Sequence, residues 1–77
     1  MPRRAKADAT ARAFGQAARR IRQERGETLD EVAGRISRMD SKYLGEVERG
    51  WHSVTISTAQ RIAVALEVPL SALVRDL

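Results

Sequence analysis

Five residues between positions 41 and 49 are spaced so that they share one side of a helix. They carry a hydroxyl, an ammonium, a carboxylate and a guanidinium group, with one glycine among them: Ser41, Lys42, Gly45, Glu46 and Arg49. Such groups donate and accept hydrogen bonds. The chemistry they offer is recognition of a polar partner, such as base edges or phosphates of a nucleic acid.

Gly45 is unusual inside a helix, because glycine costs about 1 kcal/mol relative to alanine there. We therefore expect a reason in packing or close approach. The glycine could let the helix sit deep in a groove, or it could allow close contact with the preceding helix. The sequence leaves both explanations open.

The chain offers little material for catalysis or metal binding. It has no cysteine and one histidine, His52, which alone cannot build a zinc site or a catalytic triad. No glycine-rich loop for cradling phosphates is present. We predict that the protein is not an enzyme and has no catalytic residues, no metal, no cofactor and no small-molecule substrate.

Positive charge is concentrated at the N-terminus. Residues 1–25 contain eight Lys or Arg and two acidic residues, a local charge of +6, whereas residues 26–77 carry a local charge of −2. This asymmetry favours a nucleic-acid partner, although a solvated helix face would look similar. Residues 1–10 are expected to form a flexible basic arm. Its Arg3, Arg4 and Lys6 could enter a minor groove, strengthen non-specific binding, or have no specific role.

The remaining chain, residues 11–77, is predicted to be one all-α domain of five helices. The first helix covers residues 11–25 and ends at Gly26. Thr28 and Glu31 have the form of a capping box, so a second helix begins at Leu29. Its predicted buried face consists of Leu29, Val32, Ala33 and Ile36.

The third predicted helix covers residues 41–49, with Asp40 as its N-cap and Gly50 at its end. Thr55 can cap a fourth helix, and Pro69 suits the first turn of a short fifth helix. No segment alternates long enough to predict a strand. Because no apolar run approaches the ~20 residues of a membrane span, we expect a cytoplasmic protein, with no membrane partner, that joins the nucleoid when bound to DNA.

The second and third predicted helices are short and are joined by a few residues, which is the pattern of a helix-turn-helix. In that motif the first helix braces against the phosphate backbone. The second lies in the major groove, where its N-terminal side chains reach base edges. The polar face that begins at Ser41 is suited to this role.

The same segment resembles the phage-repressor-like helix-turn-helix family, the XRE/Cro group. The resemblance rests on residues 28–33, on residues 39–50 and above all on the string Tyr-Leu-x-x-Val-Glu-Arg-Gly. It covers roughly residues 14–74. The chain length and the Val-Thr-Ile segment are similar to the controller proteins of restriction–modification systems. The resemblance implies a homodimer that binds a pseudo-palindromic DNA operator and controls transcription, and the controller-like features add autoregulation of its own operon as an expectation. An antitoxin or protein-interaction adaptor with the same fold is the alternative.

The resemblance also suggests roles for individual residues. Positions at the start of the recognition helix and in the loop after it match DNA contacts, and Arg22 and Glu48 match a structural ion pair. The predicted DNA-binding set is Ser41, Lys42, Tyr43, Glu46, Arg49, His52, Ser53, Thr55, Thr28 and Arg38. The chain departs from the family pattern at three places. The stretch from Ala33 to Met39 is one residue longer than usual, with Ser37-Arg38 where a turn glycine is common. Glu67 replaces the usual helix-ending glycine, and Leu29 replaces a phosphate-binding glutamine.

Several of these roles have alternatives. Lys42 could bond guanine, a phosphate, or only water, and Tyr43 could donate its hydroxyl to a phosphate or simply pack. Glu46 could accept a hydrogen bond from cytosine N4, could repel the wrong sequence, or could be a surface residue without effect on binding. Arg49 is expected to bind phosphate or to pair with Glu46 or Glu48. Trp51 is expected to pack over its loop, with a dimer interface or the DNA flank as alternatives.

The C-terminal segment is more apolar than the end of a small core requires. We predict that Leu70, Leu73, Val74 and Leu77 form a dimer seam, with packing inside the chain as the alternative. Two-fold symmetry would place two recognition helices about 34 Å apart, one turn of DNA.

Overall fold

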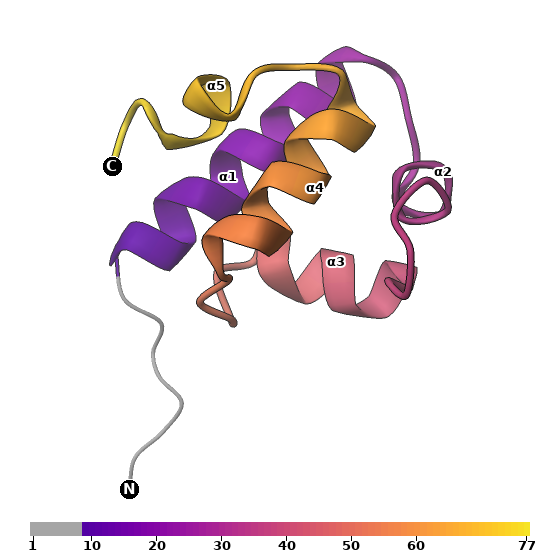
Figure 1. The fold of residues 1–77 in the computed structure, drawn as a ribbon, viewed down its shortest axis with the longest axis horizontal. Coiled ribbons are helices and arrows are strands. Elements are labelled where there is room, and N and C mark those ends of the chain that lie inside the picture. The colour runs from indigo at the N-terminus through magenta and orange to yellow at the C-terminus, as the bar shows by residue number, and fades with distance from the viewer. Residues whose placement is uncertain (1–8) are drawn as a thin grey trace, which may run out of the picture.

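The computed structural model describes residues 9–77, which form five α-helices and no strand (Figure 1). The helices are α1 (Ala9–Glu24), α2 (Leu29–Ala33), α3 (Ser41–Glu48), α4 (Ile56–Leu66) and α5 (Leu70–Val74). The predicted all-α fold of five helices is thus confirmed. Arg3, Arg4 and Lys6 of the predicted arm lie outside the described residues.

The helix ends differ from the predicted ones by a few residues. Ala9 and Thr10, expected in the arm, belong to α1. Pro69 is the N-cap of α5 rather than a residue of its first turn. The largest difference is in α2, which ends at Ala33 with Gly34 as its C-cap. Ile36 is nevertheless buried, because the turn after α2 directs it into the core.

Three predicted N-caps are present. The Thr28 hydroxyl accepts a hydrogen bond from the Glu31 backbone N–H at 3.1 Å, and the Glu31 carboxylate accepts one from the Thr28 N–H at 2.8 Å. The Asp40 carboxylate caps α3 at 2.8 Å, and the Thr55 hydroxyl caps α4 at 3.0 Å. These bonds satisfy backbone donors that a helix start leaves free, so the sequence sets where α2, α3 and α4 begin.

Two residues without glycine's freedom adopt left-handed backbone conformations. Arg38, in the turn before α3, has φ 63°, and Glu67, which ends α4, has φ 61°. Glu67 replaces the helix-ending glycine of the family pattern, and Arg38 belongs to the Ser37-Arg38 pair where a turn glycine is common. A left-handed conformation costs about 1–2 kcal/mol for a residue with a Cβ, so the surrounding packing must hold both turns in place.

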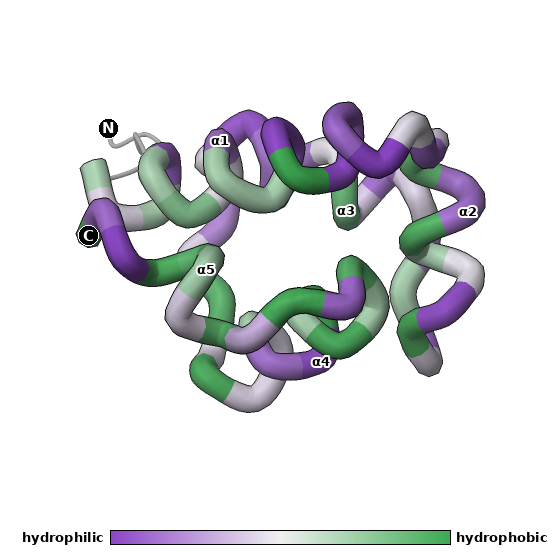
Figure 2. The backbone as a smooth tube through the Cα atoms, turned by 90° about the horizontal axis from the view of Figure 1, so that it is seen from above, coloured by the Kyte–Doolittle hydropathy of each residue, from purple (hydrophilic) through white to green (hydrophobic). Residues whose placement is uncertain are grey.

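Every helix contributes to one core. Phe14, Val32, Leu44, Ile62 and Leu73 are each at most 5% exposed. Figure 2 shows that hydrophobic residues dominate α4 and α5, whereas the connection between α1 and α2 is largely hydrophilic. α1 contacts α3, α4 and α5, and α4 contacts α1, α2 and α5, so these two helices connect the others.

The close approach of α1 and α3 depends on Gly15. A Cβ at this position would lie 2.2 Å from the Val47 carbonyl oxygen and 2.6 Å from that of Glu48. Both are backbone atoms near the end of α3 and cannot rotate away. The absence of a side chain at Gly15 therefore sets the distance between these helices.

Glu27 connects three parts of the fold. Arg25 Nε donates to its carboxylate at 2.9 Å, and Arg35 donates to both carboxylate oxygens. Arg35 also donates to the Ala65 carbonyl at 2.9 Å, so the cluster reaches the end of α4. The hydrogen bonds from Arg35 and then from Arg25 lower the pKa of Glu27 from 4.5 to about 2.

This depressed pKa predicts a loss of stability in acid. A carboxylate with a lower pKa in the folded state contributes stability that is complete above its unfolded pKa and is lost as the pH falls through its folded pKa. We expect the melting temperature of the wild type to fall between about pH 5 and pH 2, and Glu27→Gln to lower it at pH 7 and to flatten this fall. Thermal unfolding followed by circular dichroism at several pH values measures the melting temperature of wild type and variant.

Glu24→Gln is the control, because Glu24 is exposed and its ion pair with Arg20 is long at 3.9 Å. Parallel pH curves for wild type and Glu27→Gln would contradict the prediction.

Candidate nucleic-acid interface

One face of the N-terminal half of α3 is not covered by the rest of the described chain. The Lys42 side chain is 83% exposed, and Ser41 is half-exposed. The opposite side of the helix is in the core, where Leu44 and Val47 are almost completely buried. One face of α3 thus anchors the helix, and the other presents polar groups to solvent.

Glu46 is at the centre of a polar network on this exposed face. Its carboxylate accepts a hydrogen bond from Lys42 Nζ at 3.2 Å and lies 2.8 Å from His52 Nε2. The interaction with His52, followed by that with Lys42, lowers the pKa of Glu46. Glu46 therefore remains a charged hydrogen-bond acceptor near neutral pH, with Lys42 and His52 limiting its movement.

His52 also connects the network to Tyr43. The two rings stack with their centroids 5.0 Å apart and their planes 24° from parallel. Tyr43 is half-buried and packs against the core. The loop after α3 is thereby attached to the first turn of α3, although His52 follows Tyr43 by nine positions in the sequence.

Arg49 and Trp51 form a second pair on the exposed face. The Arg49 guanidinium lies over the Trp51 ring, 4.9 Å from its centroid. Trp51 is 52% exposed, so the expectation that it packs over the loop is wrong. Within residues 9–77, the Arg49 guanidinium thus contacts this ring and forms no ion pair with Glu46 or Glu48.

A nearly buried ion pair holds the other side of α3. Arg22 Nε and Nη2 donate to the two Glu48 carboxylate oxygens at 2.7 and 2.9 Å, and Arg22 Nη1 donates to the Glu27 carbonyl at 2.9 Å. The hydrogen bonds that Arg22 donates to Glu48 raise the pKa of Arg22. The predicted structural pair is present. It joins the end of α1 to the end of α3 and so helps to fix the direction in which α3 points.

A family model described as helix-turn-helix, HTH_3, matches residues 19–73 of the chain. The chain belongs to the helix-turn-helix family. A search of curated protein sequences finds no match of significance. Helix-turn-helix domains of this type bind DNA and regulate transcription, so the chain is a DNA-binding transcription regulator and not an enzyme.

Solved structures of other regulators are similar over most of the chain. The clp gene regulator ClgR from C. glutamicum has a TM-score of 0.83 and 30% identity, covering 90% of this chain and 88% of that one. The restriction-modification controller protein C.AhdI from Aeromonas hydrophila has a TM-score of 0.78 and 32% identity over 86% of this chain and 98% of that one. The BldD DNA-binding domain from S. venezulae has 28% identity and a TM-score of 0.77, with coverages of 87% and 99%.

In this helix-turn-helix protein, α2 and α3 are the paired helices. Four residues of the predicted DNA-binding set line one shallow hollow on the exposed face of α3: Ser41, Lys42, Glu46 and Arg49. Leu29, Gly45 and Trp51 complete the lining. Leu29 and Trp51 were missing from the predicted set. The signals that could have found them are the unusual leucine at a glutamine position and the aromatic residue directly after the family string.

Four further residues of the predicted DNA-binding set do not line this hollow. Thr28 and Thr55 are exposed, and each uses its hydroxyl to cap a helix. Arg38 is exposed in the turn before α3. Ser53 is exposed in the loop between α3 and α4, where it lines a separate apolar cavity.

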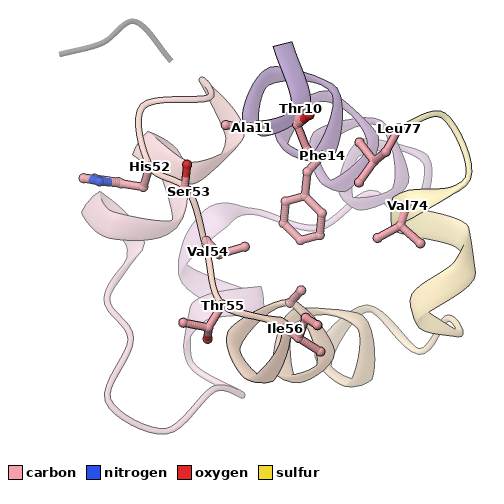
Figure 3. Close-up of a pocket in the computed structure, with 11 residues that line it drawn as sticks. Thr10, Ala11, Phe14, His52, Ser53, Val54, Thr55, Ile56, Val74 and Leu77 are labelled. Carbon is pink, nitrogen blue, oxygen red and sulfur yellow. The ribbon is translucent and has the colours of Figure 1, made fainter. Parts of the chain in front are cut away.

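That second cavity has a volume of about 170 Å³ and lies between the start of α1, the loop before α4 and the C-terminus (Figure 3). Val54, Phe14 and Val74 point toward it, whereas the His52 side chain points away. Two apolar residues on its lining are exposed, Ile56 at 80% and Leu77 at 55%. The four C-terminal residues predicted for a dimer seam differ in their burial. Leu73 is 1% exposed and packs inside its own chain, Leu70 and Val74 are half-buried, and Leu77 is largely exposed.

Other kinds of site receive no support from the described residues. Within residues 9–77, no group of three or more histidine, cysteine or acidic side chains is arranged to hold a metal ion. In the same region, no helix is long and apolar enough to cross a membrane.

Proposed function

We propose that this regulator binds a pseudo-palindromic operator as a homodimer, with the N-terminal part of α3 in the major groove of each half-site. The observation that carries the proposal is the exposed polar face of α3 beside a rigid attachment on the opposite side. Lys42 is 83% exposed, and the Arg22–Glu48 pair restrains the helix from behind. A helix that reads bases needs both features, because its side chains must reach the groove at a fixed angle.

The proposal includes control of the protein's own operon, as in a restriction–modification controller. The 32% identity to C.AhdI over 98% of that chain supports this part. The basic residues Arg3, Arg4 and Lys6, within residues 1–10, would add attraction to the phosphate backbone in this proposal. The protein would act in the cytoplasm, on the nucleoid.

The primary experiment is selection of bound sequences from a random DNA library or from fragments of the genome. We expect a two-fold symmetric sequence to be enriched, with half-sites about one helical turn apart. A library that shows no enrichment, with binding that depends only on salt, would overturn the proposal.

Lys42→Ala is expected to weaken binding to the selected operator by about 1–3 kcal/mol if Lys42 reads a base. The loss should then be smaller on unrelated DNA. If Lys42 instead binds a phosphate, the loss should be similar on all sequences, and the slope of log affinity against log salt should become shallower by about one. Fluorescence anisotropy at several salt concentrations distinguishes these outcomes.

Arg20→Ala is the matched control, because it removes one positive charge from an exposed residue of α1 paired with Glu24. If the two variants lose the same affinity at every salt concentration, Lys42 has no special role. Specific recognition through this end of α3 would then be contradicted.

The proposed dimer would use the apolar surface near the C-terminus. Leu77 and Ile56 are exposed and line the cavity that Val74 also lines, and Leu70 is half-buried at the start of α5. Burial of these side chains by a second copy would remove them from water and is worth about 25 cal/mol for each Å² of apolar surface.

Leu77→Asp is expected to convert the dimer to a monomer, because a charge would be buried against an apolar surface. Analytical ultracentrifugation over a range of concentrations measures this change. Val64→Asp is the control, since Val64 is similarly exposed at 63% but does not line the cavity. A dimer that persists in Leu77→Asp and dissociates in Val64→Asp would place the interface elsewhere on α4.

A further inference from the structure

The side chain of Arg49 lies over the middle of α3, although Arg49 itself is the C-cap of that helix. Its Nη1 and Nη2 atoms are 3.7 and 3.9 Å from the point where a Cβ of Gly45 would be. The side chain therefore runs back along the helix by about one turn, as helical geometry favours. Its guanidinium lies one turn closer than its Cα to the end of α3 that carries Lys42.

The guanidinium lies close to both Gly45 and Trp51. The centroid of the Trp51 ring is 4.9 Å from the guanidinium carbon, and Gly45 has no side chain to meet the guanidinium nitrogens. All three residues line the hollow that Lys42 and Glu46 also line. A planar guanidinium stacked on an aromatic ring loses much of its freedom, but its N–H groups still point outward from the ring edge.

This arrangement accounts for one feature that packing inside the chain leaves unexplained. A large aromatic side chain is 52% exposed at Trp51, on the polar face of the molecule. Gly45 is a separate matter, because a Cβ there would meet Leu29 Cδ1 at 3.4 Å and Arg49 Nη1 at 3.7 Å, both ordinary contacts. Neither close packing against α2 nor the guanidinium therefore requires a glycine, which answers one of the two possibilities raised by the sequence.

We propose that Arg49 reads a guanine in the major groove, and that Trp51 is the residue that positions it. This inference rests on the proposed binding of α3 to an operator. It differs from the phosphate contact that the family resemblance implies for Arg49. The reason is placement: the guanidinium lies near Gly45, in the hollow that Lys42 and Glu46 also line, on the face that a helix in the groove turns toward base edges. Arginine binds guanine through O6 and N7, two acceptors that match its two parallel N–H donors.

The test uses the full chain and the operator obtained by selection. Each guanine of one half-site is replaced in turn by 7-deazaguanine, which lacks only the N7 acceptor. We expect one replacement to weaken binding of the wild type by about tenfold. For Arg49→Lys, which keeps the charge but loses the planar pair of donors, we expect about tenfold weaker binding to the natural operator and no further loss with the modified guanine.

Trp51 is tested as a positioning residue with Trp51→Leu and Trp51→Phe. Trp51→Leu should reduce the preference for the operator over unrelated DNA by severalfold and should weaken the effect of 7-deazaguanine. Trp51→Phe keeps an aromatic face, so it should retain most of the operator preference and most of the 7-deazaguanine effect. A purely structural role would instead lower the melting temperature and leave the 7-deazaguanine effect intact. Arg20→Lys is the control for an arginine-to-lysine change away from α3.

Two results would overturn the inference while leaving the proposed function in place. In the first, each replacement of guanine by 7-deazaguanine changes the affinity of wild type and of Arg49→Lys by the same factor. In the second, Arg49→Lys loses the same affinity on operator and unrelated DNA, which indicates a phosphate contact. If no sequence is enriched at all, the proposed function fails, and the inference fails with it.

Discussion

Arg22→Met is expected to destabilise the fold by about 3–5 kcal/mol, the largest effect that we predict for one substitution. Glu48 is 6% exposed, and its two carboxylate oxygens accept from Arg22 at 2.7 and 2.9 Å. Without the guanidinium, a buried carboxylate would remain without its ionic partner. The substitution also removes the hydrogen bond from Arg22 to the Glu27 carbonyl, which helps to close the turn before α2. Urea denaturation followed by circular dichroism measures the free energy of unfolding.

The double substitution Arg22→Met, Glu48→Leu is the informative companion. It removes both charges, so no unpaired charge stays buried, and much of the lost stability should return. Arg20→Met is the control for loss of an exposed arginine from α1, and its effect should be below about 1 kcal/mol, as expected for a surface pair. If Arg22→Met costs no more than Arg20→Met, the ion pair does not hold α3 in place.

Gly15→Ala is expected to destabilise the fold by about 2–3 kcal/mol, even though alanine favours helix formation. The added methyl group would lie 2.2 Å from the Val47 carbonyl oxygen, so α1 and α3 would have to move apart. Forcing an extra group into a packed interior typically costs about 1–3 kcal/mol, and here the obstacle is backbone. The gain in helix propensity, about 1 kcal/mol, offsets only part of the cost. Chemical denaturation again gives the free energy of unfolding.

Gly45→Ala provides a matched control for this prediction, because it makes the same change in α3 without the clash. Its nearest neighbour would be 3.4 Å away, so the propensity gain should dominate and the melting temperature should rise by roughly 5 °C. Opposite signs for the two glycine variants would support the contact of α1 with α3. Stabilisation by both would contradict it.

These two predictions concern how α3 is held, and both bear on DNA binding. Arg22 and Gly15 act on the C-terminal half of α3 from the side that faces α1. A small tilt there would move the far end of the helix, where Lys42 and Ser41 would meet the DNA. Variants that still fold should therefore lose operator affinity, although neither residue lies on the exposed face.

Much of the fold follows from local features of the sequence. Thr28 with Glu31, Asp40 and Thr55 mark helix starts because their side chains satisfy backbone N–H groups within the same few residues. The spacing of apolar residues identifies the buried face of each helix for a similar reason, since it depends only on helical geometry. The end of α2 was harder to predict, because α2 ends at Ala33 while the buried Ile36, in the turn that follows, continues its apolar pattern.

The candidate site was predicted less completely. Lys42, Glu46 and Arg49 were identified from their shared helix face, yet their partners were not. The His52–Tyr43 stack, the His52–Glu46 contact and the Arg49–Trp51 pair each depend on the path of the loop after α3. That path is set by packing around Gly50 and Val54, which a local pattern does not describe.

By itself, the amino-acid sequence determined that this chain forms an all-helical helix-turn-helix protein with a polar recognition helix, because caps, periodicity and a dense family string are all local signals. Only the tertiary structure decided which polar groups meet, that Trp51 is exposed beneath Arg49, and that Leu73 is used inside its own core. Those outcomes depend on the distance and angle between helices, which result from contacts between residues far apart in the chain.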